Sequence, residues 1–411
     1  MRIQGVLDAI ETAGNRLPTP AMLFVILCFM VLGLSGLAGL LSLQAVHPVS
    51  GDTIHAINLL SVSGLHRIIS EAVTNFTSFA PVGTVLVAIM GVGVAEHSGL
   101  LNALLRVTIL RAPGQLLTFT IVLAGVLSSL AADTGYVVLI PLAAMVFAGA
   151  GRHPVAGIAA AFAGVSGGFS ANLMIGPIDA LLAGISTEAA ALVQPDYEVN
   201  AAGNFYFMIV STFVIAFIGT WITEKIVSPR LSGKFEDSQE IEQVSVQDKF
   251  GLKAVALFSL LFMCLLLVGL VPEAGILRDQ TTGSILSSPF MRGIVTIIAV
   301  YAALAGILFG RVSGRYRRSS EFVDGMEKHM ATMAGYLVLM FFASQFVSYF
   351  SWSNLGIIIA ISGASLLEVL QINSALLLVG FILLAAFINL FIGSASAKWA
   401  LIAPVFVPML L

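Results

Sequence analysis

Two stretches of the sequence share one order of residue types: residues 122–141 read VLAGVLSSLAADTGYVVLIP, and residues 385–404 read AAFINLFIGSASAKWALIAP. Each begins with an apolar arm, continues through a tip of small and polar residues, and ends with an aromatic residue, four apolar residues and a proline. Each lies within an apolar segment of about 35 residues, 116–150 or 376–411, which is too long for one membrane crossing and too short for two of about 20 residues each. The pattern predicts two re-entrant hairpins, which enter the membrane and turn back within it.

The composition places most of the chain in lipid. Hydrophobic residues make up 58% of the 411 residues and charged residues 10%, whereas a soluble domain carries about 25% charged residues. Apolar runs long enough to cross a bilayer as helices recur along the chain, and the alternating pattern of a membrane β-barrel is missing. We therefore predict an all-α polytopic membrane protein, and the net charge of −3 gives no sign of nucleic-acid binding.

The apolar runs outside the hairpins predict membrane-spanning helices. Two flanking segments, 63–78 and 319–332, carry charges on one face and apolar residues on the other, which favours amphipathic helices at the membrane surface. The predicted spans are 19–44, 79–102, 155–185, 205–224, 254–272, 291–310 and 332–350.

The order of these elements predicts two repeats separated by a polar linker. The second repeat has only a short returning arm and no polar flank before Leu411, so we expect it to be incomplete. The predicted parts are an N-terminal segment with the first helix (1–62), the first repeat (63–224), a cytoplasmic linker (225–253), two membrane helices (254–310) and the second repeat (311–411).

The basic residues indicate how the chain lies in the membrane. With the N-terminus in the cytoplasm, most Lys and Arg residues fall in cytoplasmic loops and only Arg67, Arg278 and Arg292 fall outside, as the positive-inside rule requires. The first hairpin then enters from the cytoplasm and the second from the periplasm, so the two repeats are inverted. Inverted repeats with interrupted helices are typical of secondary transporters. We therefore expect a multi-pass transporter of a bacterial inner membrane.

The predicted span 155–185 holds the first candidate site. It contains the run AGVSGGFSAN at 163–172, whose glycines weaken a helix, so we expect two half-helices here. Asp179 follows the break in an otherwise uncharged segment, and a carboxylate inside the membrane is a candidate for binding a proton or a cation. Ser170 and Asn172 lie at the break and could assist it. A solvated position for Asp179 near the outer interface is the alternative.

Each hairpin tip carries one charged residue. Asp133 at the first tip could coordinate a cation or accept a proton, or it could only cap the half-helix that follows. Lys398 at the second tip could pair with a carboxylate or attract an anionic substrate, and the alternative is that it extends to the membrane surface. Both residues are therefore candidates for the transport site.

The second tip also carries uncharged groups suited to a small ligand. Asn389, Ser394, Ser396 and Trp399 supply an amide, two hydroxyls and an aromatic ring. Such groups suit an amphipathic aromatic substrate. We predict substrate binding at these four residues, although tryptophan also favours membrane interfaces.

An enzyme is the alternative from a different class. The segment 164–167 matches the short GxSG signature of intramembrane serine proteases, with Ser166 as the nucleophile. The histidines lie at span ends or in loops, so Ser166 has no evident buried base. The sequence contains neither a zinc-protease HExxH motif nor a phosphate-binding P-loop. We expect no enzyme activity and no cofactor, and an ion gradient as the energy source.

Four segments together resemble the p-aminobenzoyl-glutamate transporter (AbgT) family of the ion-transporter superfamily, and the resemblance runs along essentially the whole chain. It is carried by NFTSFAPVGTVLVAIMGVGVAEHSGL (75–100), DTGYVVLIPLAA (133–144), GRHPVAGIAAAFAGVSGGFSANL (151–173) and FINLFIGSASAKWALIAPVFVPML (387–410).

The resemblance implies a homodimer of subunits with nine membrane helices and two re-entrant hairpins. It implies proton-coupled movement of p-aminobenzoyl-glutamate or p-aminobenzoate, or export of sulfonamide antimetabolites. The family's functional positions match Asp179, Asn389, Ser396 and Trp399. Members of the family continue past the second hairpin, which is a second reason to expect an incomplete site. Sodium coupling to a dicarboxylate, as in related transporters, is the alternative within the same class.

Overall fold

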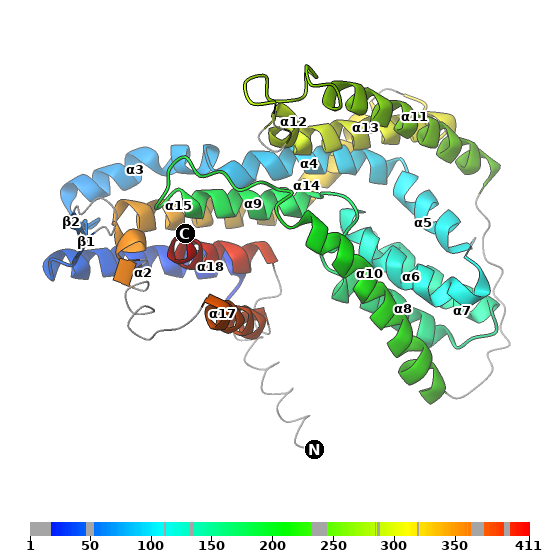
Figure 1. The fold of residues 1–411 in the computed structure, drawn as a ribbon, viewed down its shortest axis with the longest axis horizontal. Helices are drawn as coiled ribbons and strands as arrows, with labels where there is room; N and C mark the ends of the chain where they lie inside the picture. Colours follow the sequence, from blue (N-terminus) through cyan, green and yellow to red (C-terminus); the bar gives the residue numbers. More distant parts are fainter. Residues whose placement is uncertain are drawn as a thin grey trace. The chain divides into compact units, whose positions relative to one another are not determined.

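The computed structural model of the chain is almost entirely helical (Figure 1). It divides into two compact units, the first made of Met1–Gly83, Leu181–Val199 and Met333–Leu411 and the second of Thr84–Ala180 and Asn200–Thr332. The structure describes residues 18–46, 53–110, 112–131, 135–231, 245–283, 285, 288–318, 320–359, 361–362, 374–389 and 395–411.

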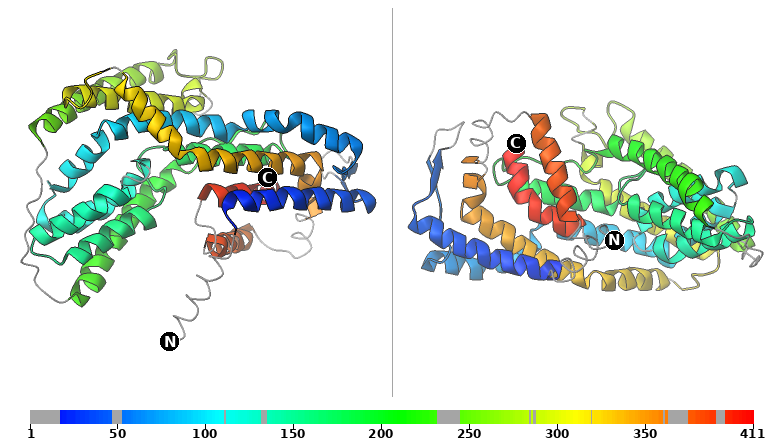
Figure 2. Two further views of the ribbon diagram at one scale, coloured as in Figure 1. Left: turned by 180° about the vertical axis from the view of Figure 1, so that it is seen from behind. Right: turned by 90° about the horizontal axis from the view of Figure 1, so that it is seen from below.

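The first unit is organised around two long apolar helices, α2 (Pro20–Leu40) and α15 (Ala334–Trp352), which pack along one another (Figure 2). Phe24 of α2 meets Phe346 of α15 edge-on, with ring centroids 5.8 Å apart. Because lipid tails are as apolar as these side chains, close packing rather than escape from water stabilises such a pair within a bilayer.

A buried amide joins α15 to helix α3 (Val62–Thr77). Gln345 is 3% exposed, its Nε2 donates to the carbonyl of Ala72 at 2.9 Å, and its Oε1 accepts from Asn75 Nδ2 at 2.9 Å. Both polar atoms of the amide are therefore satisfied, as burial requires. The contact fixes α3 against α15 at one register.

Two short strands of the first unit were not predicted. Strands β1 (Gln44–Val46) and β2 (Thr53–His55) pair antiparallel, with Gln44 opposite His55. At three residues each they are too short for alternation to be recognised in the sequence.

The second of the two predicted hairpins also lies in the first unit. It consists of α17 (Ser374–Asn389) and α18 (Ala395–Leu410).

The first hairpin lies in the second unit and has the predicted interrupted form. Its first arm is α6 (Leu117–Leu127), which continues into a 3₁₀ turn, η2 (Ser128–Ala131). Its second arm starts with a π-helical turn, η3 (Gly135–Leu139), and continues as α7 (Ile140–Gly149). Each α-helical arm is about half the length that a crossing needs.

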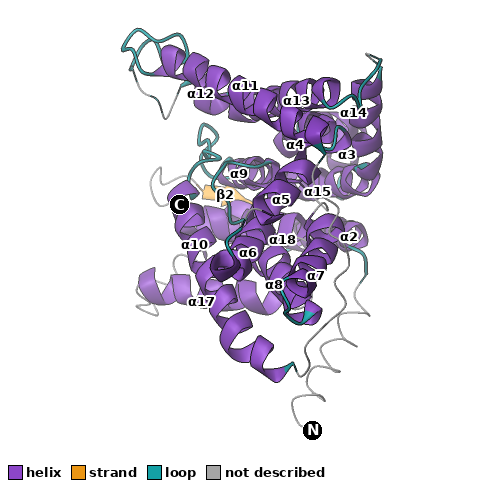
Figure 3. Ribbon diagram, turned by 90° about the vertical axis from the view of Figure 1, so that its right-hand side faces the viewer, coloured by secondary structure: helices purple, strands orange, loops and turns teal. Residues whose placement is uncertain are grey.

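Helix α8 (Pro154–Gly167) lies against both arms of this hairpin (Figure 3). Glycines allow the closest approach. A Cβ at Gly164 would lie 2.4 Å from the carbonyl oxygen of Val122, and one at Gly125 would lie 2.9 Å from the Cα of Gly164. Only glycine fits here, because the two backbones touch. The hairpin and α8 therefore pack as one layer.

In the second unit α10 and α5 also pack against this layer, and α11 and α13 pack on one another. Helices α4 and α9 cross from one unit to the other. The bounds are α4 (Ala80–His97), α5 (Leu100–Leu110), η1 (Gly114–Leu116), α9 (Pro177–Ala190), α10 (Phe205–Ile222), η4 (Thr223–Val227), η5 (Ser228–Arg230), α11 (Val246–Leu270), α12 (Pro289–Arg292), α13 (Ile294–Val312) and α14 (Glu321–Thr332).

Six helical stretches of the described chain are long and apolar enough to cross a membrane, which confirms the polytopic helical fold. The expected break in 155–185 is also confirmed, because α8 ends at Gly167 and α9 begins at Pro177. The six stretches are Pro20–Leu40, Val62–His97, Phe205–Arg230, Val246–Leu270, Ile294–Val312 and Ala334–Trp352.

The structure refines three predicted boundaries. The predicted amphipathic segment 63–78 coincides with α3, and α3 and α4 together form the candidate span Val62–His97. That span ends before 102 because Gly99 adopts a φ of +80°, which terminates the helix. The end of the predicted linker is helical from Val246, where Ser245 caps α11 by accepting from the amide of Asp248.

Candidate functional site

The break between α8 and α9 follows directly from its sequence. Helix α8 ends in a glycine run, and Ser170 beyond it has a φ of +68°, a conformation that costs energy for any residue with a Cβ. Pro177 then opens α9, where its missing N–H and fixed φ suit a first helical turn. The segment between the two helices therefore leaves backbone and side-chain polar groups available at mid-span.

A small cavity lies at this break. The volume open to the centre of a water-sized sphere is about 10 Å³. This is room for one water molecule or one small ion. Its lining comes from the end of the hairpin's first arm, from the break and from the first turn of α9: Ser129, Ser170, Asn172, Gly176, Pro177, Ile178 and Asp179. The structure thus brings together three of the predicted residues, Ser170, Asn172 and Asp179.

Hydrogen bonds fix the side chains around the cavity. Asp179 is 8% exposed, and its Oδ2 accepts from the amide of Gly176 at 2.6 Å. Asn172 is 3% exposed, and its Nδ2 donates to Ser129 Oγ at 3.1 Å. Ser129 in turn donates to the carbonyl of Val126 at 3.0 Å. This chain of contacts ties the hairpin tip to the broken helix.

Ser129 was not among the predicted site residues. The run of two serines at the end of the first apolar arm was a signal of a polar tip, but it did not indicate which serine would face Asn172. The partner lies 43 residues away, and that distance is closed only by the packing of the hairpin on α8. Asp133, the charged residue predicted at this tip, lies outside the described residues.

The cavity has the chemistry of a site for a proton or a small hard cation. A carboxylate, hydroxyl groups and an amide line it, and oxygen atoms of this kind are the ligands that hard cations prefer. The ion pairs found among the described residues do not include Asp179. A buried carboxylate without a cationic partner favours either protonation or a bound cation.

The second hairpin brings two more predicted residues together. Lys398 Nζ donates to Asn389 Oδ1 at 2.8 Å, between the first turn of α18 and the last residue of α17. Among the described residues its partner is an amide oxygen rather than a carboxylate, and this contact leaves the positive charge uncompensated. An ammonium carries three donors, so the group retains capacity for an anionic ligand.

The indole ring of Trp399 is fixed by contacts with two other side chains of the protein. Its Nε1 donates to Ser186 Oγ of α9 at 2.8 Å, and Phe381 meets the ring edge-on at 6.4 Å between centroids. Because the indole N–H is already used, Trp399 offers a ligand its ring face rather than a hydrogen-bond donor. Ser396 is half-buried on the same helix, and Ser394 lies outside the described residues.

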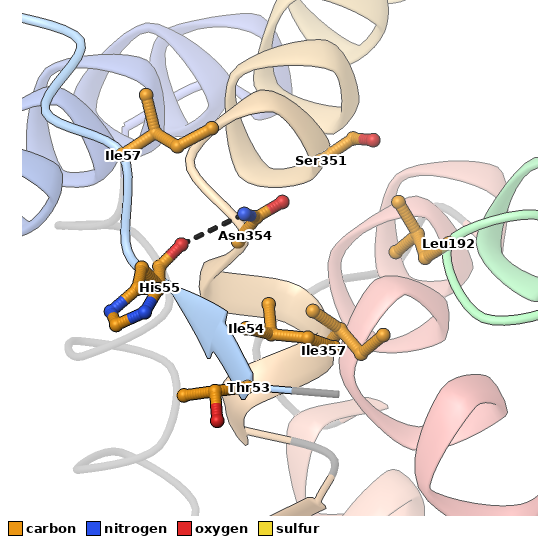
Figure 4. Close-up of a pocket in the computed structure, with 8 residues that line it drawn as sticks. All are labelled: Thr53, Ile54, His55, Ile57, Leu192, Ser351, Asn354 and Ile357. Atoms are coloured by element: carbon orange, nitrogen blue, oxygen red, sulfur yellow. Dashed lines mark hydrogen bonds between the residues drawn. The ribbon is translucent and has the colours of Figure 1, made fainter. Parts of the chain in front are cut away.

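A larger hollow of the first unit involves none of the predicted residues. It has a volume of about 510 Å³ and lies where β2 approaches the segment that follows α15 (Figure 4). Asn354 Nδ2 donates to the carbonyl of His55 there at 2.8 Å, and Ile54 and Ile357 lie beside this contact. Its size alone does not make it the transport site, because it holds no buried ionisable group.

Comparison with known proteins shows the family of the chain. The AbgT transporter family matches residues 5–411 of the chain. The p-aminobenzoyl-glutamate transport protein of Escherichia coli (strain K12) is 37% identical over 401 residues, which are 97% of this chain and 79% of that protein.

Two solved structures are also similar. The YdaH transporter of Alcanivorax borkumensis, described as having an unusual topology, gives a TM-score of 0.89 at 48% identity over 96% of this chain and 83% of its own. MtrF of Neisseria gonorrhoeae, described within a class of antimetabolite efflux pumps, gives 0.92 at 45% identity over 98% and 83%. The relatives are transporters and not enzymes, so the protease reading of Ser166 is wrong. The chain is a membrane transporter and belongs to the AbgT family.

Proposed function

We propose that the chain is a proton-coupled secondary transporter of p-aminobenzoyl-glutamate, p-aminobenzoate or sulfonamide-like compounds, and that it exports antimetabolites. The substrate class rests on the relatives, one named for p-aminobenzoyl-glutamate transport and one placed among antimetabolite efflux pumps. The observation that carries the coupling is the buried Asp179 beside a cavity for a single small species.

A proton suits this cavity better than a larger ion. Protonation of Asp179 would neutralise a buried charge that has no cationic partner among the described residues. It would remove a cost of several kcal/mol in a medium of low dielectric constant, about 4 to 20. A sodium ion would need several oxygen ligands, and the side chains at hand are Ser129, Ser170, Asn172 and Asp179. Sodium coupling to a dicarboxylate is the alternative that the hydroxyl and amide oxygens favour.

The second hairpin supplies groups for the organic substrate. The ring face of Trp399 suits an aromatic amine or amide, and the Lys398 ammonium suits a carboxylate of a glutamate moiety. Asn389 holds that ammonium through its Oδ1, which leaves its amide N–H groups for the substrate. We assign these three residues to substrate binding, together with Ser394 and Ser396 as predicted from the sequence.

Flux in proteoliposomes tests the proposal. Labelled p-aminobenzoyl-glutamate and a sulfonamide are followed while a proton gradient or a sodium gradient is imposed separately. We expect movement driven by the proton gradient alone. Asp179→Asn should reduce this flux at least tenfold while exchange of labelled for unlabelled substrate continues, because only coupling requires the titrating carboxyl.

A second carboxylate on the same helix provides the control. Glu188 is partly exposed on α9 and does not line the cavity, so Glu188→Gln should retain gradient-driven flux. Full flux in Asp179→Asn would remove Asp179 from the mechanism. Flux that follows the sodium gradient at constant pH would instead establish the alternative coupling.

We also propose a homodimer in a bacterial inner membrane with a cytoplasmic N-terminus. The apolar spans support the membrane location, and the basic loops between them support the orientation. Single cysteines placed in the segments 232–244 and 281–283 of a background without Cys28 and Cys264 test it. A membrane-impermeant thiol reagent applied to intact cells should label the second position and not the first.

A further inference from the structure

The helical hairpin of α11 and α13 encloses an apolar groove at the end where the two helices are joined. Its volume is about 540 Å³, the larger of the two hollows described for the chain. Along α11 it extends from Phe262 to Gly269, and it continues over the turn at Pro272 to Leu277. At about 1.5 Å per residue its part along α11 spans roughly 10 Å, about two-thirds of the roughly 15 Å of hydrocarbon in one leaflet.

The groove opens toward lipid rather than toward the protein core. Leu265, Val268 and Val300 line it and are more than two-fifths exposed, and Ile276 in the connecting loop is 82% exposed. Exposed branched side chains on a membrane helix face acyl chains. The groove is therefore a cleft in a lipid-facing surface, with the shape and chemistry of an acyl-chain site.

An arginine lies at the rim of the groove. Arg278 follows Leu277, a lining residue, and its backbone N–H donates to the carbonyl of Gly275, another lining residue, at 3.0 Å. The Nε of its guanidinium is buried and has no hydrogen-bond acceptor among the residues that the structure describes. Because Nε itself is shielded, an external ligand would contact the terminal Nη groups of this partly exposed side chain. A phosphate is the group that arginine binds best.

Acidic residues beside Arg278 restrict the choice of ligand. Glu273 and Asp279 lie in the same loop, and hydrogen bonds from the side chain of Thr281 and from the backbone of Thr281 and Thr282 keep the pKa of Asp279 below its usual range. The loop therefore carries negative as well as positive charge at neutral pH. A headgroup with a net negative charge would meet both carboxylates, whereas a zwitterionic headgroup would complement the two signs.

We propose that this groove binds one molecule of an amine-bearing zwitterionic phospholipid. An acyl chain occupies the cleft between α11 and α13, the phosphodiester accepts from the Arg278 guanidinium, and the headgroup ammonium lies near Glu273 or Asp279. Phosphatidylethanolamine has this chemistry. Phosphatidylglycerol has no ammonium group, and the quaternary ammonium of phosphatidylcholine has no N–H donors. Both lipids should therefore bind more weakly than phosphatidylethanolamine.

Native mass spectrometry of the full chain, released from detergent after incubation with each lipid, tests the proposal. We expect one retained phosphatidylethanolamine and at least fivefold less retention of the other two lipids. Arg278→Gln should lower phosphatidylethanolamine retention at least fivefold by removing the phosphate contact. Val300→Trp should do the same by filling the cleft.

Each variant has a matched control in the same unit. Arg292→Gln removes a neighbouring arginine that already has a contact within the chain, and Leu304→Trp places the same bulky ring one turn further along α13, outside the cleft. Both should retain the lipid, and thermal unfolding of all four variants identifies any that fail to fold.

Wild-type retention in Arg278→Gln and Val300→Trp would overturn the site. Equal retention of phosphatidylglycerol would overturn the choice of headgroup. Loss of self-association in Val300→Trp with unchanged lipid retention would overturn the lipid in favour of a second copy of the chain.

Discussion

The two hairpins share one order of residue types but differ in how they are covered. Val122 in the first arm of the first hairpin is fully buried, whereas Leu383 in the first arm of the second is 66% exposed. The first arm α6 is enclosed by α8 and α10, while α17 presents most of its leucines outward. Only the inner arm α18 of the second hairpin is buried, through small residues such as Ala400 and Ala403. A shared pattern therefore specifies the turn within the membrane but not its neighbours.

The largest expected effect comes from a glycine in the covered region. A Cβ at Gly164 would lie 2.4 Å from the carbonyl oxygen of Val122, so Gly164→Ala must separate α8 from the hairpin. We expect a loss of about 1–3 kcal/mol in the free energy of unfolding. Thermal unfolding in detergent measures it.

Gly380 in the exposed arm is the matched control. A Cβ there would meet nothing within 4 Å, so Gly380→Ala should leave stability unchanged or raise it by up to about 1 kcal/mol. If both alanine variants lower the free energy of unfolding equally, the difference in burial between the two hairpins does not affect stability.

A charged contact at the foot of the first hairpin should have the next largest effect. Arg152 Nη2 lies 2.6 Å from Glu224 Oε1, and the Thr118 hydroxyl contacts both side chains, accepting from Arg152 at 2.9 Å and donating to Glu224. Glu224→Gln removes one charge from this partly exposed cluster and should cost about 1–2 kcal/mol. Chemical denaturation that shows no change would mean that the cluster does not hold the hairpin.

A functional difference between the hairpins is the third test. Lys398 is partly exposed, and its hydrogen bond among the described residues is to an amide, so Lys398→Met should change stability by less than about 0.5 kcal/mol. It should raise the KM for p-aminobenzoyl-glutamate about fivefold and leave that for a sulfonamide without a carboxylate unchanged. Equal effects on both substrates would show that the ammonium does not contact the glutamate moiety.

The smallest effect is a pH dependence outside both hairpins. His329 of α14 lies 2.8 Å from Glu96, and this hydrogen bond, with the charge of Glu96 and the carbonyl of Gly325, raises the pKa of the imidazole despite partial burial. The stabilisation is complete below the unfolded pKa of about 6.5 and is lost as the pH rises through the higher folded pKa. Between pH 6 and 8 the unfolding temperature of wild type should fall relative to His329→Gln. Parallel curves would exclude this contact as the cause.

The features set by local sequence could be predicted, and those set by packing could not. Glycine, proline and the polar tips indicated both hairpins and the break in 155–185, because these residues act on their own backbone. The partners did not follow: Asn172 meets Ser129, Lys398 meets Asn389 rather than a carboxylate, and the Trp399 indole is fixed by Ser186. The last contact joins residues 213 positions apart, which no local pattern encodes.

The hydrogen bond of Trp399 also means that its fluorescence can report on the second hairpin. The chain contains three tryptophans, and Trp221 and Trp352 lie outside the predicted site, one on the exposed face of α10 and the other stacked under Arg67. With both replaced by phenylalanine, a single indole would remain, and its emission depends on the bond to Ser186 and on what lies against its face. Substrate titrations could then be followed without a label, in detergent or in lipid, and on the millisecond timescale of stopped-flow mixing.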